Sequence, residues 1–283
     1  MTGIEIVLYL QSLRSPALDM VMLSISALGS GYAYMVMLPL VYWAIDRRRG
    51  WLLALVFLSS MGANAIIKDF TEVLRPFQVD ARVALIGPKP ITYAFPSGHA
   101  QGTMMVWGGL AIMHSSTPAA ILGGCIIFAV GLARLYLGVH SPLQVGAGWV
   151  FGGLGLAGTF ALFKLSEMSP QATRQWWARM LWTLAGCSMI ILHPSRETIP
   201  AGTTLIAVAV LEYWERKWIG FDDCQRVSQR IARLAVGLIP AGALLALHNY
   251  LLPEALWAEG MLFSLLGGWM LLGAPYLFKK SRI

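Results

Sequence analysis

The chain contains few charged residues for its length. Of its 283 residues, 12% are charged and 57% are hydrophobic, whereas a soluble domain has about 25% charged residues. The mean hydropathy is +0.64. This composition excludes an ordinary soluble domain and predicts an integral membrane protein. No cleavage site precedes the apolar run that starts near Leu18, so we expect that run to be a retained membrane helix.

Cysteine and clustered metal ligands are also scarce. The three cysteines, Cys125, Cys187 and Cys224, lie far apart in the sequence. This spacing excludes a disulfide framework and a zinc motif, and small buried cysteines are expected instead. No group of carboxylate, Cys and His residues has metal-ligand spacing. We therefore expect neither a metal ion nor another cofactor.

The net charge of +7 does not indicate a nucleic-acid-binding protein. The basic residues lie in short loops between apolar runs, which is the pattern that orients a membrane protein. The sequence also lacks an N-glycosylation sequon, because neither Asn64 nor Asn249 has Ser or Thr two positions later. This absence favours a bacterial inner-membrane protein over a eukaryotic membrane enzyme.

Apolar segments recur along the whole chain, and a spanning helix needs about 20 apolar residues. Nine segments are candidates: Leu18–Ile45, Trp51–Ile67, His99–His114, Ala119–Ala133, Pro142–Phe163, Trp176–Leu192, Ala201–Tyr213, Ile231–Leu251 and Trp257–Phe278. Gly29-Ser30-Gly31 predicts a break in the first, and Ile4–Leu13 predicts a short interfacial helix. The expected fold is all-α, a polytopic transmembrane helical bundle of about nine spans.

Basic residues predict the orientation of these spans. They cluster after spans one, five, seven and nine: Arg47, Arg48, Arg49, Lys164, Arg174, Arg179, Arg216, Lys217, Arg226, Arg230, Arg233, Lys279, Lys280 and Arg282. With nine spans these ends share one side, which the positive-inside rule identifies as the cytoplasm. The long loop Lys68–Ser97 then lies on the other side. Its positive charges contradict the rule there, which indicates a functional reason for them.

Three short motifs share that non-cytoplasmic face. The first is Lys68 and Arg75, with six residues between them and Pro76 following; the second is Pro96–His99; the third is Arg134 and His140, with five residues between them. Each motif lies at the outer end of an expected span. A bundle of spans two to five can therefore bring all three together.

The residue types in these motifs predict a phosphate site. Lys68, Arg75 and Arg134 supply fixed positive charges, and arginine can hold phosphate oxygens through paired N–H donors. Ser97 and Gly98 precede a helix whose N-terminus offers free backbone N–H groups to an anion. His99 and His140 suit nucleophilic and acid–base roles near neutral pH. The pattern predicts metal-free phosphoryl transfer, which depends on positioning and charge stabilisation.

In this order and spacing, the motifs resemble the three-part signature of the phosphatidic acid phosphatase type 2 superfamily, which includes vanadium haloperoxidases. The resemblance covers Lys68–Gln144, with helical surroundings from Leu18 to Phe163. It implies that His140 is a nucleophile that becomes phosphohistidine and that His99 protonates the leaving group. Five further residues would stabilise the pentacoordinate phosphorus: Lys68, Arg75, Ser97, Gly98 and Arg134.

Two positions depart from the usual signature. Ala133 stands where a serine commonly precedes Arg134, so one hydroxyl is missing. Gln144 stands four residues after His140, where an aspartate is usual. Its amide oxygen can still accept a hydrogen bond from the imidazole and fix the tautomer, without supplying a negative charge. In this glutamine and in its nine spans the chain is also similar to the glucose-6-phosphatase branch.

The resemblance implies a metal-independent membrane phosphatase, a phosphoric monoester hydrolase, that cleaves a phosphomonoester or pyrophosphate on the non-cytoplasmic face. We expect residues 1–166 to form the catalytic core, spans one to five, and residues 167–283 to add a transmembrane extension. Lipid phosphates are the expected substrates, because a site at the membrane face can receive a head group laterally. Alternatives are a sugar-phosphate phosphatase, a lipid phosphotransferase and a degenerate phosphate-binding or transport protein. Membrane lipids are expected partners, nucleic acid is not, and a homodimer is compatible with the sequence.

Overall fold

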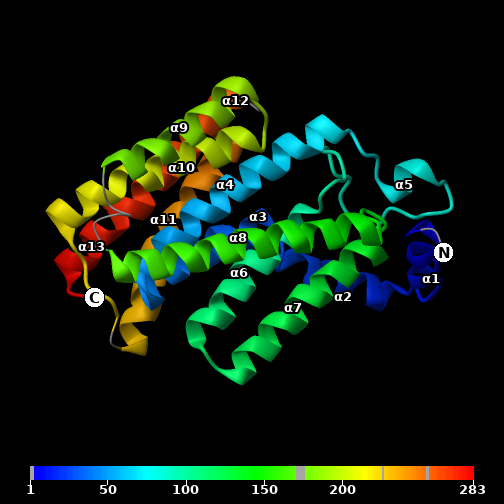
Figure 1. Ribbon diagram of the computed structural model, residues 1–283, viewed down its shortest axis with the longest axis horizontal. Helices are drawn as coiled ribbons and strands as arrows, with labels where there is room; N and C mark the ends of the chain where they lie inside the picture. The colour runs from blue at the N-terminus through cyan, green and yellow to red at the C-terminus, as the bar shows by residue number, and fades with distance from the viewer. Residues whose placement is uncertain (1–2, 170–175, 225, 253–254) are drawn as a thin grey trace. The chain divides into compact units, whose positions relative to one another are not determined.

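The computed structural model describes residues 3–169, 176–224, 226–252 and 255–283 (Figure 1). All regular elements within these ranges are helical. The α-helices are α1 Gly3–Ser12, α2 Pro16–Ala27, α3 Gly31–Leu40, α4 Arg47–Thr71, α5 Pro76–Val79, α6 Gly98–His114, α7 Thr117–Tyr136, α8 Pro142–Met168, α9 Trp176–Leu192, α10 Thr198–Trp214, α11 Val227–Leu251, α12 Leu256–Gly268 and α13 Ala274–Ser281. The π-helical turns are η1 Val41–Ile45, η3 Glu215–Ile219 and η4 Trp269–Gly273.

The expected helices are present, but the expected number of spans is not confirmed. Within the described ranges, five stretches are long and apolar enough to cross a membrane: Arg47–Val79, Thr117–Tyr136, Pro142–Met168, Val227–Leu251 and Leu256–Ser281. The pair α2 and α3–η1 makes six if it counts as one span, bent by 45°. The bend falls at the Gly29-Ser30-Gly31 break expected from the sequence.

Three other expected spans form shorter helices. Helices α6, α9 and α10 have 17 residues each, which corresponds to about 26 Å at 1.5 Å per residue. That length is at the lower limit for crossing the hydrocarbon core. The protein is an integral, multi-pass membrane protein, while the exact number of crossings depends on these three helices.

The fold divides into two units: Met1–Met35 with Ala63–Gly158, and Val36–Gly62 with Thr159–Ile283. In the first unit, α6 and α7 lie side by side as a helical hairpin (Figure 1). Serines begin the helices here, because their side-chain oxygens accept otherwise unpaired N–H groups of the first turn. Ser15 caps α2, Ser97 caps α6 and Ser116 caps α7.

Glycines allow α8 to pack directly on the backbone of α6. A Cβ atom at Gly148 would lie 2.6 Å from the carbonyl oxygen of Ser97, and one at Gly152 would lie 2.6 Å from that of Gln101. Small residues permit this close approach between membrane helices. The start of α8 is therefore held against the Pro-Ser-Gly-His turn.

Hydrogen bonds from α1 fix the segment between α5 and α6. The side chain of Gln11 donates to the carbonyls of Ala84 and Tyr136, at 2.8 and 2.9 Å, and accepts from the N–H of Ala84 at 2.9 Å. Nearby, Ile86, Tyr136, Leu137 and Val139 form a buried apolar cluster. The segment Lys68–Ser97, expected as one long loop, is partly helical, since α4 extends to Thr71 and α5 lies within the rest.

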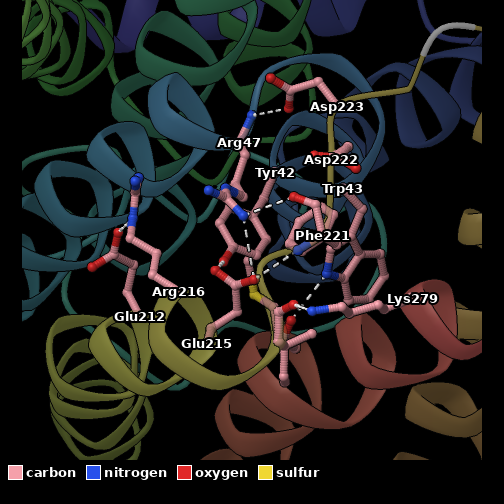
Figure 2. A network of polar contacts seen from close by, with 12 residues as sticks. Tyr42, Trp43, Arg47, Glu212, Glu215, Arg216, Phe221, Asp222, Asp223 and Lys279 are labelled. Carbon is pink, nitrogen blue, oxygen red and sulfur yellow. Dashed lines mark hydrogen bonds and ion pairs between the residues drawn. The ribbon is translucent and has the colours of Figure 1, made fainter.

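The second unit contains a buried ionic network around Arg47 (Figure 2). Nη1 of Arg47 donates to the carbonyl of Phe221 at 2.7 Å and to Oε1 of Glu215 at 3.4 Å. Glu215 also accepts from the N–H of Phe221 at 3.3 Å and from the hydroxyl of Tyr42 at 3.5 Å. Because these groups satisfy one another's hydrogen-bonding needs, we interpret the network as structural: it stabilises the packing of η1 and η3.

Basic residues that were expected to orient the spans take part in such ion pairs. Besides Arg47, Arg179 lies 3.0 Å from Glu212, and Arg216 pairs with the same carboxylate. Glu212 and Glu215 are almost fully buried. These arginines therefore contribute to the packing of the second unit. Arg174, another residue of the expected basic clusters, lies outside the described residues.

Candidate active site

The imidazole of His140 lies at the centre of the candidate site, in the turn between α7 and α8. Its Nδ1 atom lies 3.2 Å from Oε1 of Gln144, and its Nε2 atom lies 3.2 Å from Nη1 of Arg75. An amide oxygen can only accept a hydrogen bond and a guanidinium can only donate. Both neighbours therefore select the same neutral tautomer, with the proton on Nδ1 and a lone pair on Nε2.

The orientation of the Gln144 amide is fixed by two backbone groups. Its Oε1 accepts from the N–H of Ser141 at 2.9 Å, and its Nε2 donates to the carbonyl of Leu74 at 3.3 Å. These contacts point the oxygen toward His140, which is the geometry that the four-residue spacing predicts. Pro142 begins α8 within this turn, as suits a residue without a free N–H at a first helical position.

Arg75 is held by backbone carbonyls on both sides. Nη1 donates to the carbonyl of Val139 at 3.0 Å, Nε donates to that of Thr92 at 2.9 Å, and Nη2 donates to that of Tyr93 at 3.1 Å. The side chain is 3% exposed. A buried guanidinium with this many fixed partners presents its charge to His140 with little freedom to move.

A threonine hydroxyl joins the two cations of the first motif. Oγ1 of Thr92 accepts from Nζ of Lys68 at 3.5 Å and from Nη2 of Arg75 at 3.3 Å. Lys68 lies in the last turn of α4 and is buried. One oxygen thus lies within reach of both cations. We interpret this as a geometry that would also suit a phosphate oxygen.

The second motif forms the N-terminus of α6 beside the third motif. Ser97 is fully buried, caps α6 and donates its backbone N–H to the carbonyl of Gln144 at 3.0 Å. Gly98 and His99 open the helix. The carbonyl of His99 accepts from the hydroxyls of Thr103 at 2.7 Å and Tyr34 at 3.3 Å. The Pro-Ser-Gly-His turn is therefore fixed from α3 as well as from α8.

Two nitrogens of the Arg134 guanidinium differ in their hydrogen bonding. Its Nη1 donates to the hydroxyl of Ser26 at 2.8 Å. Its Nε is buried and has no hydrogen-bond partner among the residues that the structure describes. A buried N–H without a partner is costly, and its presence in this cluster of cations is consistent with a ligand that accepts from it.

The environment of His140 keeps the imidazole neutral. Burial lowers the pKa of His140 well below its usual range, and the nearby positive charges of Arg134, Arg75 and Lys68 lower it further. The side chain is 2% exposed. A neutral ring with a lone pair on Nε2 is the form that a histidine nucleophile requires.

The structure thus brings the three motifs into one cluster and adds residues that sequence reasoning did not identify. These are Thr92, Ser26, Tyr34 and Asn64, whose amide donates to the carbonyl of Pro96 at 3.3 Å. No sequence pattern marks them, because they lie 17 to 108 positions from the residues that they contact. Within the described ranges, no three His, Cys, Asp or Glu side chains gather as a metal site.

Comparison with known families matches most of the chain to two related models. Residues 49–168 match the PAP2 superfamily, and residues 199–283 match the PAP2 superfamily phosphatase, transmembrane extension. All three motifs lie within the first match.

Individual relatives are similar over about half of the chain. An undecaprenyl-diphosphatase of Sulfolobus acidocaldarius is 33% identical over 48% of this chain and 66% of its own length. Phosphatidylglycerophosphatase B of Bacillus subtilis is 28% identical over 50% of this chain and 72% of its own length. The crystal structure of a PAP2-type phosphatidylglycerolphosphate phosphatase from Bacillus subtilis is 25% identical, with a TM-score of 0.49 over 57% of this chain and 84% of the other.

Proposed function

The chain belongs to the PAP2 superfamily, and on this premise we propose that it is a membrane phosphatase that removes phosphate from a lipid phosphate or diphosphate through a phosphohistidine. The expected enzyme class, a phosphoric monoester hydrolase, agrees with the phosphatase names of both curated relatives. The observation that carries the proposal is the neutral, buried His140, whose Nε2 lies beside Arg75 and whose Nδ1 is held by Gln144.

In the first step, the Nε2 lone pair of His140 attacks phosphorus. A P–N bond forms as the P–O bond to the leaving group breaks, and His99 gives its proton to the departing oxygen. The ring becomes positively charged, and Gln144 keeps its Nδ1 proton in place. Lys68, Arg75, Arg134, the side chain of Ser97 and the backbone N–H of Gly98 stabilise the charge on the phosphoryl oxygens in the transition state.

In the second step, water attacks the phosphorus of phosphohistidine. His99, now neutral, takes a proton from the water as the P–O bond forms and the P–N bond breaks. Inorganic phosphate leaves, and His140 returns to its neutral form. Because side chains and a backbone N–H group supply the charge stabilisation, the proposal requires no metal ion, and activity should survive EDTA.

The relatives favour a lipid substrate over a sugar phosphate, because one is named an undecaprenyl-diphosphatase and the other a phosphatidylglycerophosphatase. A panel comparing phosphate release from these lipids, phosphatidate and glucose 6-phosphate tests this choice. We expect turnover of at least one lipid and little of the sugar phosphate. Faster release from glucose 6-phosphate would reverse the choice, and exchange of phosphate onto an alcohol in place of water would identify a phosphotransferase.

We further propose nine crossings, with the N-terminus and the catalytic site on the non-cytoplasmic side of a bacterial inner membrane. Residues 1–166 would form the catalytic core and residues 167–283 the extension. The support is the clustering of basic residues after expected spans one, five, seven and nine. A cysteine introduced at Val79 should react with an impermeant reagent added from outside, and one at Ser281 should not. The opposite pattern would contradict this orientation.

A further inference from the structure

Arg134 is held by a serine from outside the three motifs. Ser26 belongs to α2 and lies 108 positions before Arg134, and its hydroxyl accepts from Nη1 at 2.8 Å. Ser26 is 5% exposed. The matched PAP2 region begins at residue 49, so this contact comes from a part of the chain that the family match does not include.

The position of Ser26 is fixed by the packing of α2 on α7. At the end of α7, the hydroxyl of Tyr136 donates to Oδ1 of Asp19 in the first turn of α2 at 2.6 Å. After α2 ends, a Cβ atom at Gly29 would lie 2.8 Å from Cγ1 of Val130. These two contacts hold α2 at both ends, so the hydroxyl of Ser26 occupies a defined place beside Arg134.

The two ends of the guanidinium group differ in their partners. Nη1 is tied to Ser26, whereas the buried Nε has no partner among the residues that the structure describes. Because a guanidinium group is planar and rigid, fixing Nη1 also fixes the direction of Nε–H. The residue before Arg134 is Ala133, which is fully buried and has no hydroxyl to take over this task.

We propose that Ser26 is a positioning residue that orients Arg134 for phosphate binding. The proposal rests on the proposed function of the site, since it assumes that the Nε–H of Arg134 serves a phosphoryl oxygen. Ser26 itself contacts no substrate. Without the hydroxyl of Ser26, Arg134 keeps its charge but its guanidinium loses its fixed direction. Binding of a phosphate or of a transition-state mimic should therefore weaken.

The experiment compares Ser26→Ala with Ser24→Ala. Ser24 lies on the same helix but is exposed, and its hydroxyl donates to the carbonyl of Met20 at 2.9 Å. Loss of one hydrogen bond to a charged group corresponds to roughly a 10- to 100-fold effect. We therefore expect Ser26→Ala to lower kcat/KM and vanadate affinity by about tenfold or more. Ser24→Ala should leave both at the parental value.

A double-mutant cycle separates positioning from packing. Because Ser26 acts through Arg134, Ser26→Ala should cost less than about twofold in an Arg134→Gln background. Ser26→Cys, which keeps the size but is a weak acceptor, provides a second variant if Ser26→Ala does not fold. It should reproduce the loss of vanadate affinity with an unchanged melting temperature.

The outcomes distinguish this proposal from the proposed function. A folded Ser26→Ala or Ser26→Cys protein with parental vanadate affinity would overturn the role of Ser26. An equally large loss in the Arg134→Gln background would also overturn it, since the effect would then not pass through Arg134. A parental protein that neither binds vanadate nor releases phosphate would instead contradict the proposed function.

Discussion

Nδ1 of His140 lies 3.2 Å from Oε1 of Gln144, four residues later in the chain. The same oxygen accepts from the N–H of Ser141, and the amide nitrogen donates to the carbonyl of Leu74. The amide is thus held in the orientation that keeps a proton on Nδ1 and a lone pair on Nε2. A neutral side chain provides this orientation without the negative charge that an aspartate would add.

Replacing Gln144 tests this orientation directly. Gln144→Leu should lower kcat by on the order of 10- to 100-fold, as is typical when the partner of a functional histidine is removed. Vanadate affinity should change little, because the cations are untouched. Gln144→Glu keeps an acceptor and should be the milder variant. Equal rates for Gln144→Leu and the parent would show that another group orients His140.

The lowered pKa of His140 predicts how stability depends on pH. Burial and nearby cations favour the neutral ring in the folded protein, while an unfolded histidine titrates near pH 6.5. Below about pH 6.5 the unfolded state therefore binds more protons, and stability should fall as the pH is lowered. His140→Gln should reduce this dependence, as measured by melting temperature between pH 7.5 and 5. An unchanged slope would contradict a buried neutral ring.

Thr92 should influence binding more than turnover. Its hydroxyl accepts from both Lys68 and Arg75, so Thr92→Val should disturb both cations and raise KM by about 3- to 10-fold, the effect of roughly one hydrogen bond. Thr92→Ser should restore the parental value. Thr183→Val serves as the control, since that hydroxyl donates to the carbonyl of Arg179 one turn earlier in α9. An unchanged KM for Thr92→Val would show that the Thr92 hydroxyl has no role in substrate binding.

Two glycines of α8 offer a matched test of the helix packing. A Cβ atom at Gly148 would lie 2.6 Å from the carbonyl of Ser97, whereas one at Gly146 would meet nothing within 4 Å. Gly148→Ala should therefore lower both the melting temperature and kcat/KM. Gly146→Ala should be neutral or stabilising by up to about 1 kcal/mol, the difference in helix propensity. Similar behaviour of the two variants would argue against close packing of α6 and α8.

The sequence predicts the helices and the contact between His140 and Gln144, because both depend on local information. Apolar runs predict the helices, and the four-residue spacing of His140 and Gln144, at the start of α8, predicts their contact. Ser26 and Thr92 could not be predicted, since only tertiary packing brings α2 or the segment before α6 to the cations. The number of spans could not be predicted either, because helices of 17 residues are at the lower length limit for crossing a membrane.

The most direct test of the account is to trap the covalent intermediate. Purified protein mixed with a ³²P-labelled lipid phosphate, quenched within milliseconds and kept at alkaline pH, should carry label on His140, because phosphohistidine is stable to base and labile to acid. His140→Ala should carry no label and His99→Ala should retain it longer, since His99 assists hydrolysis of the intermediate. Turnover without any protein-bound label, or label that persists in a folded His140→Ala variant, would contradict the assignment of His140 as the nucleophile.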